Sequence, residues 1–470
     1  MTRHEFHTIY EEGEEATFAL FQQILARLTA VEEKVAKNSG NSSKPPSSDG
    51  LGKPPLKPMP QSLRKKTGKK PGGQTGRDGK TLLPVEQPDQ IVTHRPESCW
   101  HCKVSLQEAH EVTYLRRQVF EMPKPSVVVT EHRAIKLRCS CCGKETQAPF
   151  PTDVLHPVQY GPHLLGFATY LHGVHLLPFA RCAQIIQDIT TASFSVGSLS
   201  QALSMATTNL EPFDRRLEKA LDQVKHKHAD ETGSRIAGRL QWVHVRCTKT
   251  LCRLFRHTHR GATALEDLSG YSGCLMSDFY SSYVRLCCSH QFCGAHLLRE
   301  LTFAHEVLGQ CWAGSLKVVI EQMVSCCHRA REEGATSVSN AGILASAFDR
   351  WVQEGLESNP LPTSPPRKRG RLAKGKVRCL LERLRDFRSQ YLAFLFDLSL
   401  PFTNNEAERD LRMWKVKGKI SGCFRTIAGA DAFCRLRSYI LTCQKQGMRL
   451  IDCLSSVFAS SPLMPDLSNA

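Results

Sequence analysis

Three groups of acidic residues have types and spacing that could bind a divalent metal ion. Asp230 lies in the strand-like segment HADETG, and Asp278 follows the short apolar segment GCLMS. Between them the sequence predicts three consecutive strands, a helix near ALEDL and a fourth strand. Because a helical crossover returns the chain in the parallel sense, the fourth strand can lie beside the first and bring both carboxylates together.

Two neighbouring buried carboxylates repel each other unless a cation lies between them, and Mg²⁺ prefers carboxylate oxygens. The pair therefore favours a divalent metal site. For either aspartate taken alone, a capping or turn residue at the end of a strand is the commoner case.

A third acid is expected within FTNNEAERDLRMWKVKGK, residues 402–419. Thr403 and Asn404 are good N-terminal caps, so this stretch predicts a helix. Glu406 and Glu408 are separated by about 200° of helix rotation, so only one of them can face the aspartate pair. Spacing alone does not decide which, and a solvated helix stabilised by pairs four residues apart is the alternative.

Two cysteine pairs, Cys99 with Cys102 and Cys139 with Cys142, flank a span that reads as alternating strands. Four such thiolates brought together would form a tetrahedral zinc site. Twenty cysteines scattered over the chain would give roughly one such pair by chance, so the position of the pairs at both edges of the span is the stronger argument. Cys141 and His101 are alternative ligands.

The composition favours a polyanionic partner. The chain has 470 residues, a formal charge of +17 and 41% hydrophobic residues, and excess Lys and Arg is typical of nucleic-acid binding. The N-terminus is acidic and polar, and the most apolar run is broken by three histidines and a proline. We therefore expect a cytoplasmic protein without a membrane segment.

Eight pieces of the sequence, taken together, resemble the insertion-sequence-66 family of bacterial DDE transposases. They are SGNSSKPPSSD, KKPGGQTGRDGKTL, the two cysteine pairs, HADETG, GCLMSDFYSSY, CGAHLLREL, PFTNNEAERDLR and GKISGCFRT. The chain departs from the family pattern at Arg77-Asp78, where a histidine is expected, and in the crowded CSCC that ends at Cys142. In CGAHLLREL we expect a structural or DNA-facing role for Cys293 and His296, because two ligands do not make a zinc site.

The resemblance implies an α/β fold with a ribonuclease-H-like catalytic core and a helical insertion. Several segments are expected in order: an N-terminal helix or short coiled coil (1–43), a basic linker arm (44–85), a zinc-binding β segment (86–150), a helical segment with two helices that could form a helix-turn-helix (155–222), the first part of the core (223–300), the helical insertion (301–395), the second part of the core (396–446) and a C-terminal tail (447–470).

The resemblance also implies function. Asp230, Asp278 and Glu408 would bind two Mg²⁺ ions, with Mn²⁺ as a possible substitute, and one zinc ion would be structural. The protein would cut the ends of an insertion sequence and join the 3′-OH ends to target DNA by two-metal phosphoryl transfer. Expected DNA contacts are Lys65, Lys66, Lys69, Lys70, Arg409, Arg412, Lys415, Lys417 and Lys419.

Expected partners are DNA, further copies of the chain and small accessory proteins of the same element, in association with the bacterial nucleoid. Two rival functions stay open. One is a ribonuclease-H-like nuclease without strand transfer, and the other is a non-enzymatic zinc-containing DNA-binding regulator.

Overall fold

The structure is a computed structural model that describes residues 6–7, 10–36, 82–122, 125–361, 374–459 and 461–468. The chain divides into two units, residues 60–128 and the remainder, and each is described by itself. The predicted DNA contacts Lys65, Lys66, Lys69 and Lys70 lie outside the described residues.

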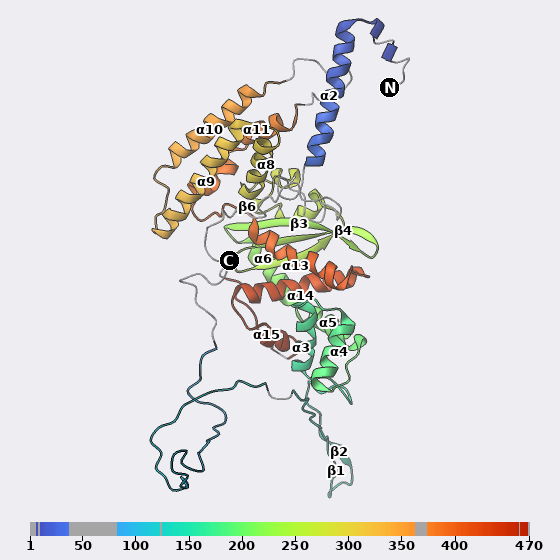
Figure 1. The fold of residues 1–470 in the computed structure, drawn as a ribbon. Helices are drawn as coiled ribbons and strands as arrows, with labels where there is room; N and C mark the ends of the chain where they lie inside the picture. Colours follow the sequence, from blue (N-terminus) through green and yellow to red (C-terminus); the bar gives the residue numbers. More distant parts are fainter. Residues whose placement is uncertain are drawn as a thin grey trace. The chain divides into compact units, whose positions relative to one another are not determined.

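A five-stranded mixed sheet forms the centre of the larger unit (Figure 1). Its strands are β3 (His226–Ile236), β4 (Arg239–Cys247), β5 (Cys252–His257), β6 (Cys274–Ser277) and β7 (Ser289–Phe292), in the order β5-β4-β3-β6-β7. β3, β4 and β5 are antiparallel neighbours, whereas β6 pairs in parallel with β3 and β7 in parallel with β6. The predicted parallel pairing of the fourth strand with the first is therefore confirmed, and a 3₁₀ helix, η2 (Ala262–Leu268), lies in the crossover.

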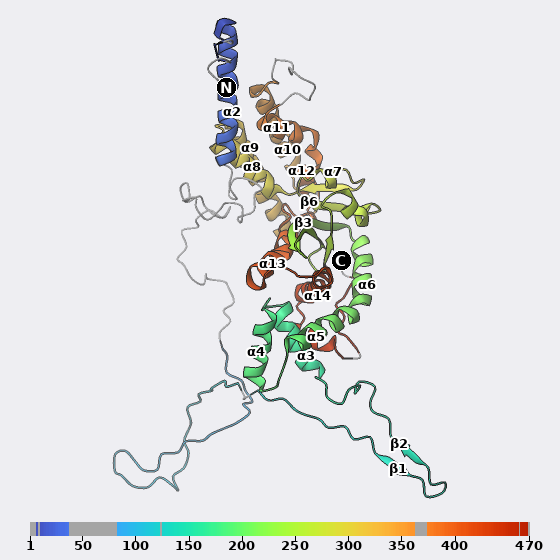
Figure 2. The ribbon, with the colours of Figure 1, turned by 90° about the vertical axis from the view of Figure 1, so that its right-hand side faces the viewer.

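Two long helices, α13 (Asn405–Ser421) and α14 (Ile427–Lys445), pack against this sheet (Figure 2). Buried side chains of both helices share one core with β4 and β5. α14 also covers the edge strand, because the backbone N–H groups of Cys252 and Leu254 donate to Thr442 Oγ1 at 3.1 Å and Ser438 Oγ at 2.8 Å. These bonds satisfy donors that an edge strand would otherwise expose.

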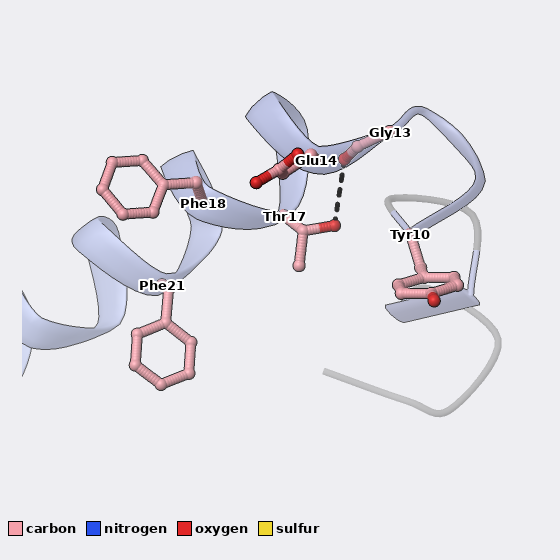
Figure 3. Close-up of a pocket in the computed structure, with 6 residues that line it drawn as sticks. All are labelled: Tyr10, Gly13, Glu14, Thr17, Phe18 and Phe21. Atoms are coloured by element: carbon pink, nitrogen blue, oxygen red, sulfur yellow. Dashed lines mark hydrogen bonds between the residues drawn. The ribbon is translucent and has the colours of Figure 1, made fainter.

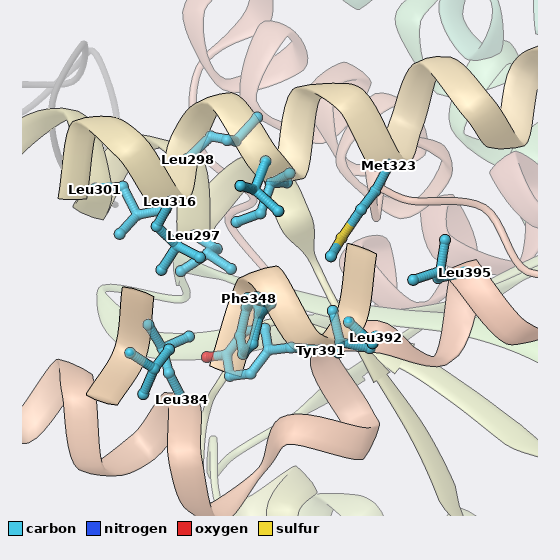
Figure 4. Close-up of a cluster of buried hydrophobic side chains, with 14 of the residues drawn as sticks. Leu297, Leu298, Leu301, Leu316, Met323, Phe348, Leu384, Tyr391, Leu392 and Leu395 are labelled. Carbon is cyan, nitrogen blue, oxygen red and sulfur yellow. The ribbon is translucent and has the colours of Figure 1, made fainter. Parts of the chain in front are cut away.

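A helical module stands between β7 and α13. It contains α8 (Gly294–Glu306), α9 (Cys311–Glu332), α10 (Ala341–Ser358), α11 (Lys376–Asp386) and α12 (Arg388–Phe396). Its core is dominated by leucines with Met323, Phe348 and Tyr391 (Figure 4). The predicted insertion is helical, but its first helix begins at Gly294 rather than at residue 301, because the apolar residues of CGAHLLREL already point into this core.

The helical module closes at its base. The Gly294 N–H donates to the Phe402 carbonyl at 2.9 Å. A Cβ atom on Gly294 would lie only 2.0 Å from the Phe402 ring, so only glycine permits this approach. The two ends of the module therefore meet at one point.

The segment 155–222 contains four helices rather than the predicted two: α3 (Pro162–Gly173), α4 (Phe179–Thr190), α5 (Val196–Asn209) and α6 (Glu211–Asp222). The first expected helix breaks where Leu176 adopts a left-handed φ of 62° ahead of Pro178, which has no N–H to donate. The second breaks at Leu210, ahead of Pro212. Ser195 caps α5 as predicted, accepting from the Ser198 N–H at 3.0 Å.

The segment that the sequence assigns to a C-terminal tail, residues 447–470, contains a packed helix. α15 (Leu450–Ser456) packs against α3, and Cys453, Leu454 and Val457 are buried. Their spacing of one, three and four residues places them on one helix face. This short apolar pattern is the sequence signal of the packed helix.

Most strands predicted between residues 86 and 150 do not form. The described residues of that range contain one hairpin, β1 (Lys136–Arg138) with β2 (Glu145–Gln147). Val119 and Val128 of the expected strands are 89% and 86% exposed, so no burial stabilises an extended ladder there.

The predicted N-terminal helix is present as α2 (Glu14–Ala36). The side chains of Phe18, Phe21 and Leu28 on this helix are exposed to solvent. At the start of the helix, the Thr17 hydroxyl donates to the Gly13 carbonyl (Figure 3). Pairing of this apolar face with another helix stays a prediction. In the part of the chain that the structure describes, no helix is long and apolar enough to cross a membrane.

Candidate active site

Asp230 and Asp278 lie on neighbouring parallel strands, the first within β3 and the second directly after β6. Asp230 Oδ1 accepts from the Glu231 N–H at 2.9 Å, and Asp278 Oδ1 accepts from the Tyr280 N–H at 3.1 Å. Burial and the carboxylates of Glu231 and Asp278 raise the pKa of Asp230 well above its usual value. Burial and Glu231 likewise raise the pKa of Asp278 to about 6. The fold therefore brings the two predicted acids into mutual electrostatic range.

Glu408 reaches the same region from the first turns of α13, and its charge contributes to the raised pKa values of both aspartates. Asn404 sets the start of this helix. It holds the N-cap position as predicted, but its side chain does not cap the helix. Its amide instead donates to the Ala229 carbonyl at 2.8 Å, next to Asp230, and its oxygen lies 2.8 Å from His228 Nδ1. Asn404 thus joins the helix that carries Glu408 to the strand that carries Asp230.

Glu406 is on a different side of α13 and has other partners. Its carboxylate lies 3.1 Å from Lys445 Nζ and 3.3 Å from Arg409. Lys445 also pairs at 3.0 Å with the buried Asp410. The spacing of the sequence left Glu406 and Glu408 equivalent, whereas the structure gives Glu406 a set of ion pairs away from the aspartates.

Sequence reasoning missed a charged network beside the aspartates. The Glu231 side chain is only 1% exposed and accepts from Arg260 Nε at 2.7 Å and from the Tyr283 hydroxyl at 2.6 Å. The Arg260 guanidinium lies 4.1 Å from the centre of the Tyr280 ring. The sequence signals this network only through the adjacent acids in HADETG. That signal does not tell which of the two acids pairs with an arginine.

A small cavity of about 90 Å³ lies next to Asp278, enough space for about three water molecules. It is lined by Asp278, Cys293, His296, Glu300, Arg383 and Tyr391, among others. Two of these lining residues, Cys293 and His296, have ligand atoms that lie with that of Glu408 within 4.8 Å of one another. Burial raises the pKa of the Cys293 thiol to about 11 and lowers the pKa of His296.

The three acids offer the oxygen ligands that a divalent cation such as Mg²⁺ prefers. The charge of Glu408 acts on both aspartates, and Glu408 Oε1 is inaccessible to solvent without a hydrogen-bond partner in the structure. Burial and the neighbouring carboxylates raise the pKa values of Asp230 and Asp278, so their charged forms are costly without a cation. A divalent ion would remove both costs.

Apart from Arg409, which pairs with Glu406 at 3.3 Å, the basic residues of α13 divide into two groups. Arg412, Lys415 and Lys419 are exposed and follow Glu408 at spacings of four, three and four residues, which places them along one side of the helix. Lys417 is only 5% exposed, donates to the Gly422 carbonyl at 3.0 Å and lies over the Phe424 ring. The ammonium group of Lys417 is therefore used inside the protein, which argues against the DNA contact predicted for it.

The two cysteine pairs form turns of the same kind. In the first, the Cys99 N–H donates to the Val104 carbonyl at 2.8 Å and the Lys103 N–H to the Cys99 carbonyl at 2.9 Å. In the second, Cys139 donates to Lys144 at 2.8 Å and Gly143 to Cys139 at 2.9 Å. Lys103 and Gly143 share a left-handed φ, of 63° and 67°.

Both turns also direct backbone N–H groups at the first thiol. Hydrogen bonds from the third and fourth residues of each turn lower the pKa values of Cys99 and Cys139. Cys141 and His101 occupy the equivalent third position, and each is used there through its backbone N–H. The fourth positions, Cys102 and Cys142, are the remaining thiols of the two turns.

Comparison with known families gives two matches. The family described as "Transposase IS66 family" matches residues 157–432. A family of unknown function, DUF6444, matches residues 7–82. No curated protein matches the chain.

Proposed function

The chain belongs to the IS66 family of transposases, and on that premise we propose that it cuts the ends of an insertion sequence and joins the 3′-OH ends to target DNA. The observation that supports this proposal is that Asp230, Asp278 and Glu408, from three separate elements, act on one another electrostatically. The strand order, with three antiparallel strands followed by two parallel ones, supports a ribonuclease-H-like core.

In this proposal Asp230, Asp278 and Glu408 would hold two Mg²⁺ ions, which when bound would supply Lewis-acid stabilisation of the attacking and leaving oxygens. The chain contributes position and charge. Asn404 fixes the start of α13 against β3, so Glu408 keeps its place relative to Asp230. Arg260, held by Glu231 and stacked on Tyr280, presents a guanidinium group beside the acids and would bind a DNA phosphate.

DNA would lie along the exposed side of α13. Arg412, Lys415 and Lys419 continue from Glu408 along that side, so the phosphates next to the scissile bond would meet successive cations. We also propose that the exposed apolar face of α2 joins copies of the chain, and that small proteins of the same element assist the reaction.

The decisive experiment uses DNA that carries the sequences flanking the gene. With Mg²⁺, the protein should cut these ends and join them to a second DNA, and gel analysis should reveal the joined product. Cleavage without joining would favour the nuclease, whereas binding without any cleavage would favour the DNA-binding regulator.

We also propose that Cys99, Cys102, Cys139 and Cys142 bind one structural zinc ion. The two turns have matching hydrogen bonds and matching left-handed residues, and each lowers the pKa of its first cysteine. Both features favour thiolate ligands, which zinc requires.

The purified protein should therefore contain about one zinc ion per chain. The double substitution Cys99→Ser/Cys102→Ser should remove it, because two remaining thiolates do not complete a tetrahedral site. Elemental analysis measures the content. The matched control is Cys287→Ser/Cys311→Ser, which replaces two exposed thiols outside the turns and should leave zinc unchanged; equal zinc in both variants would exclude the site.

A further inference from the structure

Cys293, His296 and Glu408 form a second group of possible metal ligands beside the proposed catalytic acids. Their ligand atoms lie within 4.8 Å of one another, and His296 Nδ1 is 3.9 Å from Glu408 Oε1. Both of these atoms are buried without a hydrogen-bond partner in the structure. Buried polar atoms are nearly always satisfied, so two that face each other across this gap indicate a missing partner between them.

The distances suit a small ion. With zinc bonds of about 2.0–2.2 Å to nitrogen and oxygen, two ligand atoms of a tetrahedral site are separated by roughly 3.3 Å. The observed 3.9 Å between His296 and Glu408 therefore needs a closure of about half an ångström. The adjoining cavity, which Asp278 also lines, leaves room for water as a fourth ligand.

Backbone N–H groups at Cys293 offset part of the burial that disfavours its thiolate, and a bound cation would supply the rest. This residue is the N-cap of α8, and its sulfur accepts from the Asn404 N–H at 3.2 Å. N–H groups at a helix start stabilise negative charge. Sulfur, imidazole and carboxylate together are typical ligands of Zn²⁺ or Co²⁺ and not of Mg²⁺, which prefers oxygen.

We infer that Cys293, His296 and Glu408 bind a thiophilic divalent ion such as Zn²⁺, and that this ion inhibits the protein by withdrawing Glu408 from the Mg²⁺ site. Binding depends only on the three ligands. Inhibition rests on the proposed function, because it requires Glu408 to serve in catalysis.

Co²⁺ is the probe for binding. The full-length protein, with one equivalent of zinc for the proposed four-cysteine site and no further zinc, is titrated with Co²⁺, and thiolate-to-cobalt charge transfer is followed in the near ultraviolet. Wild type should show the band at about one added equivalent. Cys293→Ser should lose it. His296→Gln should weaken binding roughly a hundredfold or more, since loss of even an outer-shell partner costs about 10–100-fold.

The matched control is Cys288→Ser. This partly buried thiol lies 3.9 Å from His290 Nε2, so it resembles the Cys293 and His296 pair, but it is outside the three-ligand group. It should leave the band unchanged. A band that persists in Cys293→Ser, or that disappears in Cys288→Ser, would overturn the site. Circular dichroism of each variant verifies folding, and His296→Gln tests the site if Cys293→Ser does not fold.

The inhibition is tested by adding micromolar Zn²⁺ to cleavage reactions that contain millimolar Mg²⁺. For each protein we compare the rate with and without Zn²⁺, and this ratio should approach one in His296→Gln. If cobalt binds but Zn²⁺ inhibits wild type and His296→Gln equally, the inhibitory role is refuted. If wild type never cleaves DNA, the proposed function fails, while the cobalt titration still decides the site.

Discussion

Glu408→Gln should abolish Mg²⁺-dependent cleavage and joining while DNA binding persists. Gln keeps the size of the side chain and the helix, but it removes the charge that a metal ion requires. Metal ions contribute several kcal/mol to such reactions, so we expect a loss of roughly 10³-fold or more. Cleavage and joining are measured on gels, and binding by fluorescence anisotropy with labelled DNA. Loss of binding in parallel with activity would instead indicate a misfolded protein.

Glu406→Gln is the matched control, since it makes the same change two residues earlier on the same helix. Glu406 pairs with Lys445 and Arg409, so its loss should cost about 0.5–1 kcal/mol of stability and leave most activity. If Glu406→Gln is inactive and Glu408→Gln is active, the third acid has been assigned to the wrong residue. If neither matters, the proposed triad is incorrect.

Asp278→Asn should make the metal-free protein more stable although it inactivates the proposed reaction. The pKa of Asp278 is raised from 3.8 to about 6 in the folded protein. A raised carboxyl pKa favours the folded state at acid pH, and this contribution is lost as the pH rises through about 6. At pH 7.5 the charged form should therefore cost about 1–3 kcal/mol, or several degrees of melting temperature.

Differential scanning fluorimetry measures this effect. Without metal, Asp278→Asn should melt above wild type at pH 7.5, and the difference should shrink at pH 5. Mg²⁺ should stabilise wild type at pH 7.5 but not the variant. Glu231→Gln is the contrasting control, because it removes the carboxylate partner of Arg260. It should lower the free energy of unfolding by about 1–3 kcal/mol, and the melting temperature with it. A wild type that is more stable than Asp278→Asn without metal would contradict the electrostatic argument.

The centre of the fold could be predicted from the sequence because alternating apolar residues identify its strands. The helical segment between the third and fourth strands then identifies a parallel crossover. The three strands around Asp230 and the return of β6 beside β3 follow from those patterns. The strands expected near Val119 and Val128 failed because propensity does not form a sheet without a face to bury.

The site was predicted only in part for a related reason. The spacing predicts that Glu406 and Glu408 lie on different sides of the helix, but it does not predict which residues each of them contacts. Their different surroundings depend on Lys445 and Asn404, which are distant in sequence from the groups they contact. In the same way, Cys293 and His296 offered two ligands in sequence, and the third comes from α13 through the tertiary fold.

The closure of the helical module at Gly294 and Phe402 has a consequence for how such chains can change length. Because the departing and returning segments are bonded to each other at the base, residues added or removed within the module need not displace Asn404 or Glu408. The entropic cost of a longer excursion is small, about 0.6 kcal/mol for each doubling of a flexible loop. Evolution or an engineer could therefore remodel this module, or graft another domain into it, while the spacing between the second and third acids in space stays the same.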